Sequence, residues 1–131
     1  LRAKKISDIH NRADICNENP NNIFISIHQN SYPVAKYSGF QIYYSKNHPE
    51  SAALAKGIEL AVREKLQPEN NRASKEAGSN IYLLQKLTCP ALLLECGFLS
   101  NPEECEKLSE KEYQKRLCFS IVCAIIEYIE D

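Results

Sequence analysis

The chain has 131 residues, which suits one domain with a hydrophobic core and is too short for two independent domains. Hydrophobic residues make up 44% of the sequence and charged residues 25%, and these ordinary globular values exclude a disordered chain. The 16 basic and 17 acidic side chains nearly cancel and no basic run occurs, so the composition predicts no nucleic-acid partner.

The first predicted element is a helix of about three turns. Its apolar residues recur at helical spacing; they are Ile6, Ile9, Ala13 and Cys16. The asparagines and the proline of residues 17–22 then predict a turn. His10 and Arg12 fall on other sides of this helix, where we expect solvent-exposed side chains.

Residues 23–28 form a predicted strand that is rich in β-branched residues. Its three isoleucines share one face, whereas Phe24, Ser26 and His28 share the other face. His28 therefore ends an apolar strand. A lone histidine in such a place is more often a hydrogen-bonded structural residue than a ligand, so both interpretations stay open.

The middle of the chain predicts a second strand, a helix and a loop. Residues 38–45 alternate like a strand with one less buried face. Pro49 suits the first position of a helix, and an apolar stripe extends that helix to residue 66, so His48 belongs to the helix start and is not expected to be a ligand. Residues 67–80 are polar and predict a surface loop. Its Arg72 is either solvated or, if the loop borders a cleft, able to contact a ligand.

The last third of the chain predicts two strands, at 81–84 and 91–95, and then a turn or short helix near Asn101. A long amphipathic helix follows over residues 113–128. Its apolar stretch, 117–126, is about half the roughly 20 residues that cross a bilayer, so no transmembrane segment is predicted. This order of elements predicts an α/β fold with a mostly parallel central sheet flanked by helices.

Glu95 is a carboxylate at the end of an apolar strand. Residues 91–94 are apolar on both faces, which is typical of a strand in the middle of a mostly parallel sheet. The carboxyl ends of such strands form the rim where ligands bind, and we expect Gly97 to allow a sharp turn there. If the two strands run parallel in one sheet, Glu95 and His28 meet at this rim. The alternative is that Glu95 caps the turn or pairs with a lysine.

The loops that follow these two strands supply further polar side chains, namely Asn30, Ser31, Ser100 and Asn101. Polar groups from distant parts of the sequence would then converge where a substrate could bind. The two strand ends together therefore predict a candidate site that neither residue predicts alone.

Six cysteines are present, an even number that allows a disulfide framework. Most of them lie in apolar patterns, and no Cys-x-x-Cys pair suggests a thiolate zinc site or a redox centre. We therefore expect mostly free thiols. Cys96 adjoins Glu95, but strand alternation sends its side chain to the opposite face, which argues against a nucleophile.

Two separated motifs resemble a known enzyme family. They read Ser-Ile-His-Gln-Asn at 26–30 and Leu-Glu-Cys-Gly-Phe-Leu-Ser-Asn-Pro at 94–102. Both are similar to the C-terminal signatures of the zinc-dependent N-acetylmuramoyl-L-alanine amidases of the amidase-3 type. The likeness covers essentially the whole chain, and its short loops resemble the compact spore-cortex members.

This resemblance implies hydrolysis of the amide between N-acetylmuramic acid and the L-alanine of the peptidoglycan stem peptide. It assigns His28 as a zinc ligand and Glu95 as the general base that takes a proton from the zinc-activated water. We predict Asn30 and Arg72 as substrate-binding residues. Because peptidoglycan lies outside the cytoplasmic membrane, the resemblance also implies an exported protein that acts in the cell wall.

A catalytic zinc site has three protein ligands and an open position for water. The other ligands of the family are a histidine in a glycine-rich turn and a glutamate downstream of it, and neither occurs in this sequence. We do not expect His10 or His48 to replace them. Since the chain starts at Leu1 and contains no methionine, we expect residues 1–131 to be the C-terminal part of a single amidase catalytic domain without its first strand. The alternative is a non-catalytic cell-wall-binding or regulatory module that lacks a complete metal site.

Overall fold

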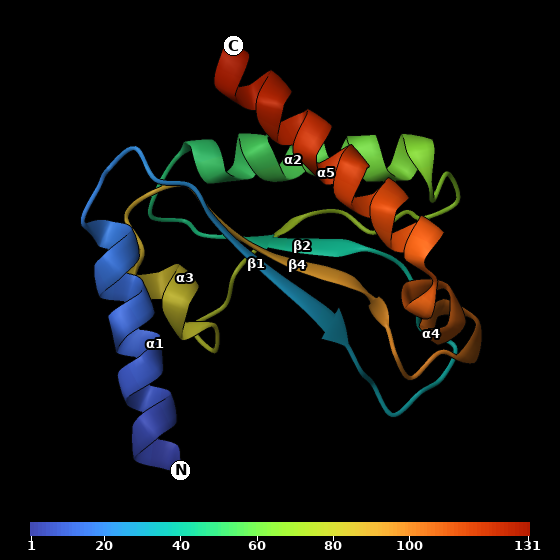
Figure 1. Cartoon of the computed structure of the whole chain (residues 1–131), viewed down its shortest axis with the longest axis horizontal. Coiled ribbons are helices and arrows are strands. Elements are labelled where there is room, and N and C mark those ends of the chain that lie inside the picture. Colours follow the sequence, from blue (N-terminus) through green and yellow to red (C-terminus); the bar gives the residue numbers. More distant parts are fainter.

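The computed structural model describes all 131 residues, and it places a four-stranded sheet between two layers of helices (Figure 1). The helices are α1 (Arg2–Asn17), α2 (Glu50–Lys65), α3 (Tyr82–Lys86), α4 (Pro102–Ser109) and α5 (Lys111–Glu130). The strands are β1 (Phe24–Asn30), β2 (Gln41–Tyr44), β3 (Lys75–Glu76) and β4 (Ala91–Phe98). None of the helices combines the length and the hydropathy that a membrane span requires.

The strands lie in the order β1-β4-β2-β3, so β4 is a central strand, as its apolar sequence predicts. β1 runs parallel to β4 and β2 runs parallel to β3, whereas β2 is antiparallel to β4. The antiparallel pairing has a simple cause: residues 31–40 join β1 to β2 without a helix, and a parallel crossover needs a longer connection. The predicted α/β fold is confirmed, with a mixed sheet.

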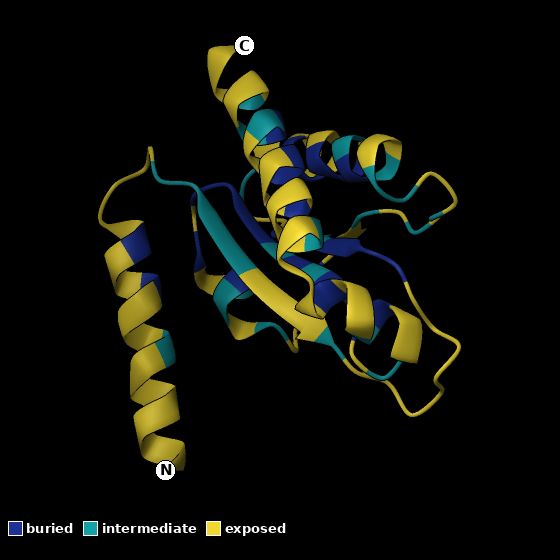
Figure 2. Cartoon of the chain, turned by 45° about the vertical axis from the view of Figure 1, so that its right-hand side comes forward, coloured by how far each residue is buried: buried dark blue, intermediate teal, exposed yellow.

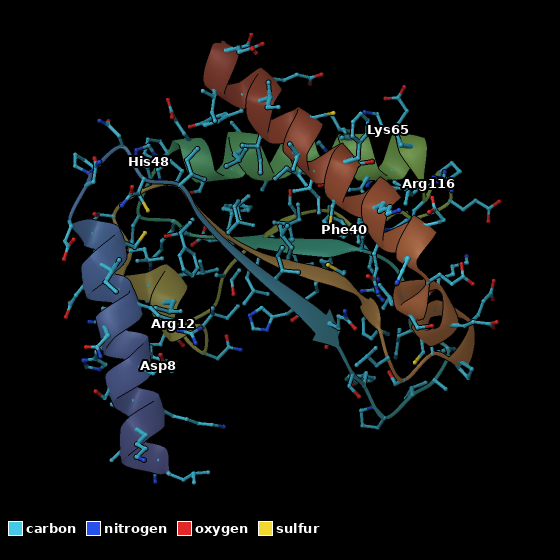
Figure 3. The ribbon with its side chains drawn as sticks, in the orientation of Figure 1. Asp8, Arg12, Phe40, His48, Lys65 and Arg116 are labelled. Carbon is cyan, nitrogen blue, oxygen red and sulfur yellow. The ribbon has the colours of Figure 1, made fainter.

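The main hydrophobic core lies between the sheet and the pair α2 and α5. Strand residues Ile42, Leu92 and Leu94 pack there against helix residues such as Ile58, and all four are almost completely buried. The labelled Phe40 lies in the same layer, below α2 and α5 (Figure 3). A smaller core on the opposite face joins α1 and α3 to the start of β4. The catalytic candidates described below lie on this second face.

β1 is an edge strand, and most of its C-terminal half is exposed (Figure 2). Ile27, on the same face as the main core, is 62% exposed. Such an edge offers unpaired backbone groups to a further strand. The interpretation of residues 1–131 as the C-terminal part of a larger domain is compatible with this edge and stays a prediction.

The predicted strand at residues 81–84 is wrong, because these residues begin α3. Leu84 and Leu87 are fully buried three positions apart, which is the spacing of one face of a helix. The amide of Gln85 donates to the carbonyl of Ile81 (3.3 Å), as in a helical turn. A four-residue apolar run does not distinguish a strand from a buried helical turn, and here the tertiary packing decides.

The other helices follow the predictions, with α2 and α5 close to their expected bounds. α1 is longer than expected, and of its residues only Ala13 and Cys16 are buried. Arg12 is exposed as predicted and pairs at 2.9 Å with Asp8, one turn earlier on α1 (Figure 3). His10 is exposed as predicted as well, and its ring stacks on Tyr82 with the centroids 5.2 Å apart.

Candidate active site

His28 and Glu95 lie side by side on neighbouring strands. They are Cα partners in the parallel ladder of β1 and β4, and Gln41 is the partner of Glu95 on the other side, in β2. Residues paired in this way point to the same face of a sheet. That face is opposite to α2 and α5, so one row of the sheet presents an imidazole, a carboxylate and an amide together. The structure thus brings together the two residues that the sequence singles out.

The Glu95 side chain is half-buried, and its Oε2 atom is fully buried without a hydrogen-bond partner. Burial raises the pKa of the Glu95 carboxyl above its usual range, and the charge of nearby His28 opposes this shift. Neither alternative for Glu95 is seen: no lysine pairs with it, and no backbone amide is capped by it. An acceptor left unsatisfied inside a protein is costly, and such atoms often mark a functional site.

The His28 side chain is exposed on the same face. Its Nε2 atom is 2.7 Å from the hydroxyl of Ser26, which leaves Nδ1 without a hydrogen-bonded protein partner. A histidine that binds a metal through one ring nitrogen commonly holds the other in a hydrogen bond. The imidazole is therefore arranged as one metal ligand would be.

No group of three His, Cys, Asp or Glu side chains in the chain is placed to hold a metal ion. His48 lies at the start of α2, at the end away from α4, where its Nδ1 accepts from the amide of Glu50 (3.2 Å; Figure 3). His10 is on α1 against Tyr82. One imidazole and one carboxylate suit zinc chemistry, but a tetrahedral site with an open position requires further donors from outside these residues.

A hollow of about 230 Å³ begins at Gln41, in the row that it forms with Glu95 and His28. Its walls are formed by the ends of β1 and β4, by β2 and by two loops, and they consist of Asn30, Tyr32, Tyr37, Gln41, Tyr43, Arg72 and Phe98. Gln41 is both a wall of the hollow and the cross-strand neighbour of Glu95. Both predicted substrate-binding residues therefore line one hollow that starts next to the carboxylate.

Arg72 is held in this wall by the groups around it. Its Nε atom donates to the carbonyl of Ser38 (2.6 Å), its Nη1 atom donates to Oε1 of Gln41 (3.3 Å), and its guanidinium lies 4.9 Å from the centre of the Phe98 ring. The loop that carries Arg72 thus borders the hollow, whereas contact of Arg72 with a ligand stays a prediction. Gln41 was missed by sequence reasoning, although it occupies a polar position of an alternating strand.

The polar loop residues have different roles from those expected. Ser100 accepts from the backbone amide of Tyr32 (2.9 Å), and Asn101 donates from its amide group to the carbonyl of Ala35 (3.0 Å). Ser31 is exposed. Ser100 and Asn101 thus fasten the loop after β1, which carries Tyr32 and Tyr37 of the hollow, to the end of β4.

Gly97 does not turn the chain, and this expectation is wrong. β4 continues through Gly97 to Phe98, and the one glycine with a positive φ is Gly39, at 107°. A Cβ atom at Gly97 would lie 2.6 Å from Oε1 of Glu104 and 2.8 Å from its Cγ. The strand needs glycine there because the Glu104 side chain packs directly against its backbone.

Glu104 is a buried carboxylate that sequence reasoning missed. Its Oε1 atom accepts from the amide of Phe98 (2.5 Å), and its two oxygens accept from the amide of Gly39 (3.0 and 2.9 Å). The sequence Asn101-x-x-Glu104 has the form of a capping box, and Asn101 does cap the amide of Glu104 (3.0 Å). The carboxylate, however, bonds to two other segments, and only the fold brings these segments together.

The six cysteines are free, as expected, and Cys96 is buried on the face away from Glu95. Burial raises the pKa of the Cys96 thiol to about 12. Burial and a contact with Cys89, whose sulfur is 3.2 Å away, raise the pKa of Cys16 to about 12 as well. Cys96 therefore lacks both the access and the thiolate character of a nucleophile.

We expect iodoacetamide at pH 8 to alkylate the exposed Cys118 of the native protein long before Cys16, Cys89 or Cys96. Peptide mass spectrometry after timed quenching measures the order. The denatured protein is the control, because all six thiols should then react. Early labelling of Cys96 in the native protein would contradict its burial and restore the nucleophile hypothesis.

Comparison with a family model, with a curated protein and with solved structures finds amidases in each case. Residues 2–127 match the Amidase_3 family, described as N-acetylmuramoyl-L-alanine amidase. The germination-specific N-acetylmuramoyl-L-alanine amidase of Bacillus subtilis (strain 168) is 35% identical over 98% of this chain and 53% of its own length.

Solved structures show the same likeness. The CwlD amidase from Clostridioides difficile, in complex with the GerS lipoprotein, aligns with a TM-score of 0.92 and 35% identity over 99% of this chain and 66% of its own. An N-acetylmuramoyl-L-alanine amidase from Clostridium difficile 630 aligns with a TM-score of 0.84 and 26% identity over 94% of this chain and 66% of its own. The chain thus spans about half the length of the Bacillus relative and about two thirds of each solved chain.

Proposed function

Because the chain belongs to the N-acetylmuramoyl-L-alanine amidase family, we propose that the protein hydrolyses the amide between N-acetylmuramic acid and the L-alanine of the peptidoglycan stem peptide. One observation carries the proposal: His28 and Glu95 are cross-strand partners, and the buried Oε2 of Glu95 has no partner of its own. No group of this chain holds that oxygen, so the carboxylate is not committed to a structural contact.

Glu95 is the general base of the proposed reaction. It takes the proton of the attacking water and returns it to the departing amine of L-alanine. A carboxyl group with an ordinary pKa is a weak base at neutral pH, and burial moves the pKa of Glu95 in the direction that strengthens it. Oε2 can accept a proton without first giving up a protein hydrogen bond.

We propose Zn²⁺ as the cofactor, with His28 as one ligand and the remaining ligands outside these 131 residues. When bound, zinc polarises the scissile carbonyl and lowers the pKa of the attacking water to about 7. Ser26 orients the His28 ring through the contact with Nε2.

Asn30 and Arg72 are the proposed substrate-binding residues. Both line the hollow that begins beside Glu95, and Arg72 is already fixed there by Ser38 and Gln41. A side chain that is held before the substrate arrives loses little entropy when it binds. Because the proposed substrate lies outside the cytoplasmic membrane, we propose that the protein is exported and acts in the cell wall.

The test uses the full-length protein supplied with zinc. We expect it to release stem peptide from muropeptides, and His28→Ala to lower both the zinc affinity and the turnover by at least about 100-fold. His48→Ala is the matched control, because His48 only caps the start of α2. Zinc affinity is measured by titration against a chelating indicator, and turnover by chromatography of the products.

Binding to peptidoglycan without any release of stem peptide would contradict the hydrolase proposal and favour the non-catalytic cell-wall-binding module. A zinc affinity that falls equally in the His28 and His48 variants would contradict the assignment of His28 as a ligand.

A further inference from the structure

A second and larger hollow adjoins the first and shares Tyr37 and Arg72 with it. Its volume of about 800 Å³ lies within the usual range for ligand sites. Its walls come from the loop before β2, the loop after α2, one side of α4 and the start of α5. The two hollows therefore adjoin at Tyr37 and Arg72, and the smaller one also contains Gln41, the cross-strand neighbour of Glu95.

The walls of the larger hollow carry more positive than negative charge toward a ligand. The cations are Lys36, Arg72 and Lys107, and the one exposed carboxylate among the lining residues is Glu69. Glu104 also lines the hollow, but its two oxygens accept from backbone amides and are turned inward. This excess of exposed positive charge favours an anionic ligand.

The two lysines are free to meet such a ligand. Lys107 has one partner, Glu103, at 3.7 Å, and both side chains of that pair are largely exposed. Lys36 has its Nζ atom 5.7 Å from the centre of the Tyr37 ring and forms no ion pair. Exposed contacts of this kind are weak, so a carboxylate can displace them at little cost.

Two polar side chains of the hollow, Gln67 and Asn70, are in contrast held in place by hydrogen bonds. Gln67 accepts from the amide of Phe40 (3.0 Å) and donates to the hydroxyl of Tyr113 (2.7 Å). Asn70 donates to the carbonyl of Phe40 (2.9 Å) and accepts from the amide of Arg72 (3.0 Å). The hollow thus combines fixed polar side chains with two exposed cations, of which Lys107 alone has an ion-pair partner.

The proposed substrate has two parts on either side of the scissile amide, which differ in charge. We call the N-acetylmuramic acid side the sugar arm and the L-alanine side the peptide arm. In the sugar arm the carboxyl group of muramic acid is consumed by the scissile amide, and the N-acetyl groups are neutral. In the peptide arm the amine of L-alanine is consumed instead, whereas the carboxyl end of the peptide stays free. The peptide arm is therefore the one that a positively charged hollow attracts.

We propose that the larger hollow is the subsite for the stem peptide, with Lys36 and Lys107 binding its carboxylates and Arg72 lying where the two hollows meet. This inference rests on the proposed function, since that function supplies the peptide. It assigns the peptide arm to the side of α4 and α5, and it makes both lysines determinants of specificity.

The test measures binding without turnover. The full-length protein is titrated by NMR with the N-acetylated tripeptide N-acetyl-L-Ala-γ-D-Glu-diaminopimelate, and with the same tripeptide after amidation of its carboxylates. We expect Lys36→Ala and Lys107→Ala each to weaken binding of the acidic tripeptide about threefold, and the double variant about tenfold. The amidated tripeptide should bind about tenfold more weakly to the unchanged protein, and high salt should remove the difference.

Lys4→Ala is the control, because it removes an equal charge from the exposed side of α1 and does not line either hollow. In turnover assays the two lysine variants should raise KM and leave kcat unchanged. Equal binding of the acidic and amidated tripeptides, or an effect of Lys4→Ala as large as that of Lys107→Ala, would overturn the subsite. The outcomes stay separate from those of the hydrolase proposal: a protein that binds the tripeptide through these lysines but releases no stem peptide refutes the hydrolase, not the subsite.

Discussion

Replacement of Glu95 by glutamine is expected to lower the turnover of the full-length, zinc-loaded enzyme by about 10²- to 10⁴-fold, the usual contribution of a general base. Glutamine keeps the size of the side chain and its place beside His28 and Gln41, so substrate binding should change little. It cannot accept a proton from water at neutral pH. The loss should therefore appear in kcat, with KM nearly unchanged.

The same substitution should raise the stability of the protein at neutral pH. Burial raises the pKa of Glu95 above its ordinary value of 4.5, so the ionised carboxylate is less favourable in the folded chain than in the unfolded chain. This destabilisation is absent well below the unfolded pKa, grows as the pH rises from the unfolded to the folded pKa, and is fully present above the folded pKa. Glu95→Gln removes it, and the gain should therefore be present at pH 7 and vanish near pH 4.

Thermal unfolding of the zinc-free protein at both pH values measures this gain. The control is Glu112→Gln, which removes a carboxylate that is 82% exposed and should change neither turnover nor stability appreciably. Full turnover in the Glu95→Gln variant would exclude Glu95 as the base. A loss of stability at pH 7 would instead identify Glu95 as a structural residue with a partner that the structure does not show.

The arrangement of His28 and Glu95 could be predicted because local patterns determine it. The alternation of isoleucines over residues 23–28 decides which side of β1 carries His28, and the uninterrupted apolar run before Glu95 indicates a central strand. Neighbouring parallel strands end at the same rim, so placing the two strands in one sheet brings the two residues together. Helices α2 and α5 were predictable for a similar reason, since each has a long apolar stripe.

The features that escaped prediction depend on contacts between distant segments. The run at residues 81–84 becomes a helix because Leu84 and Leu87 both reach the core beneath α1, and this is decided by packing rather than by propensity. The direction of β2 follows from the path of residues 31–40. The position of Arg72 beside the hollow depends on its bonds to Ser38 and Gln41, more than 30 residues away in sequence. No local pattern contains this information.

Glu104 is the clearest case, and its removal is expected to have the largest effect on stability. Glu104→Ala leaves the amides of Gly39 and Phe98 buried without an acceptor and deletes hydrogen bonds to a charged group. Losses of this kind cost about 1.5 to 3 kcal/mol for each amide, so for the two amides we expect a destabilisation of about 3 to 6 kcal/mol and a fall in Tm of more than about 10 °C.

Glu103→Ala is the matched control for this substitution. Glu103 is the preceding residue of α4, has a side chain that is 83% exposed, and forms only the long contact with Lys107, so its removal should cost less than about 0.5 kcal/mol. Urea unfolding gives both free energies, and hydrogen exchange should show lost protection at the amides of Gly39 and Phe98 in the Glu104 variant alone. Because Phe98 lines the smaller hollow and Gly39 the larger one, the one carboxylate fixes a wall of each. Equal stability of the two variants would show that the contacts of Glu104 do not hold these walls.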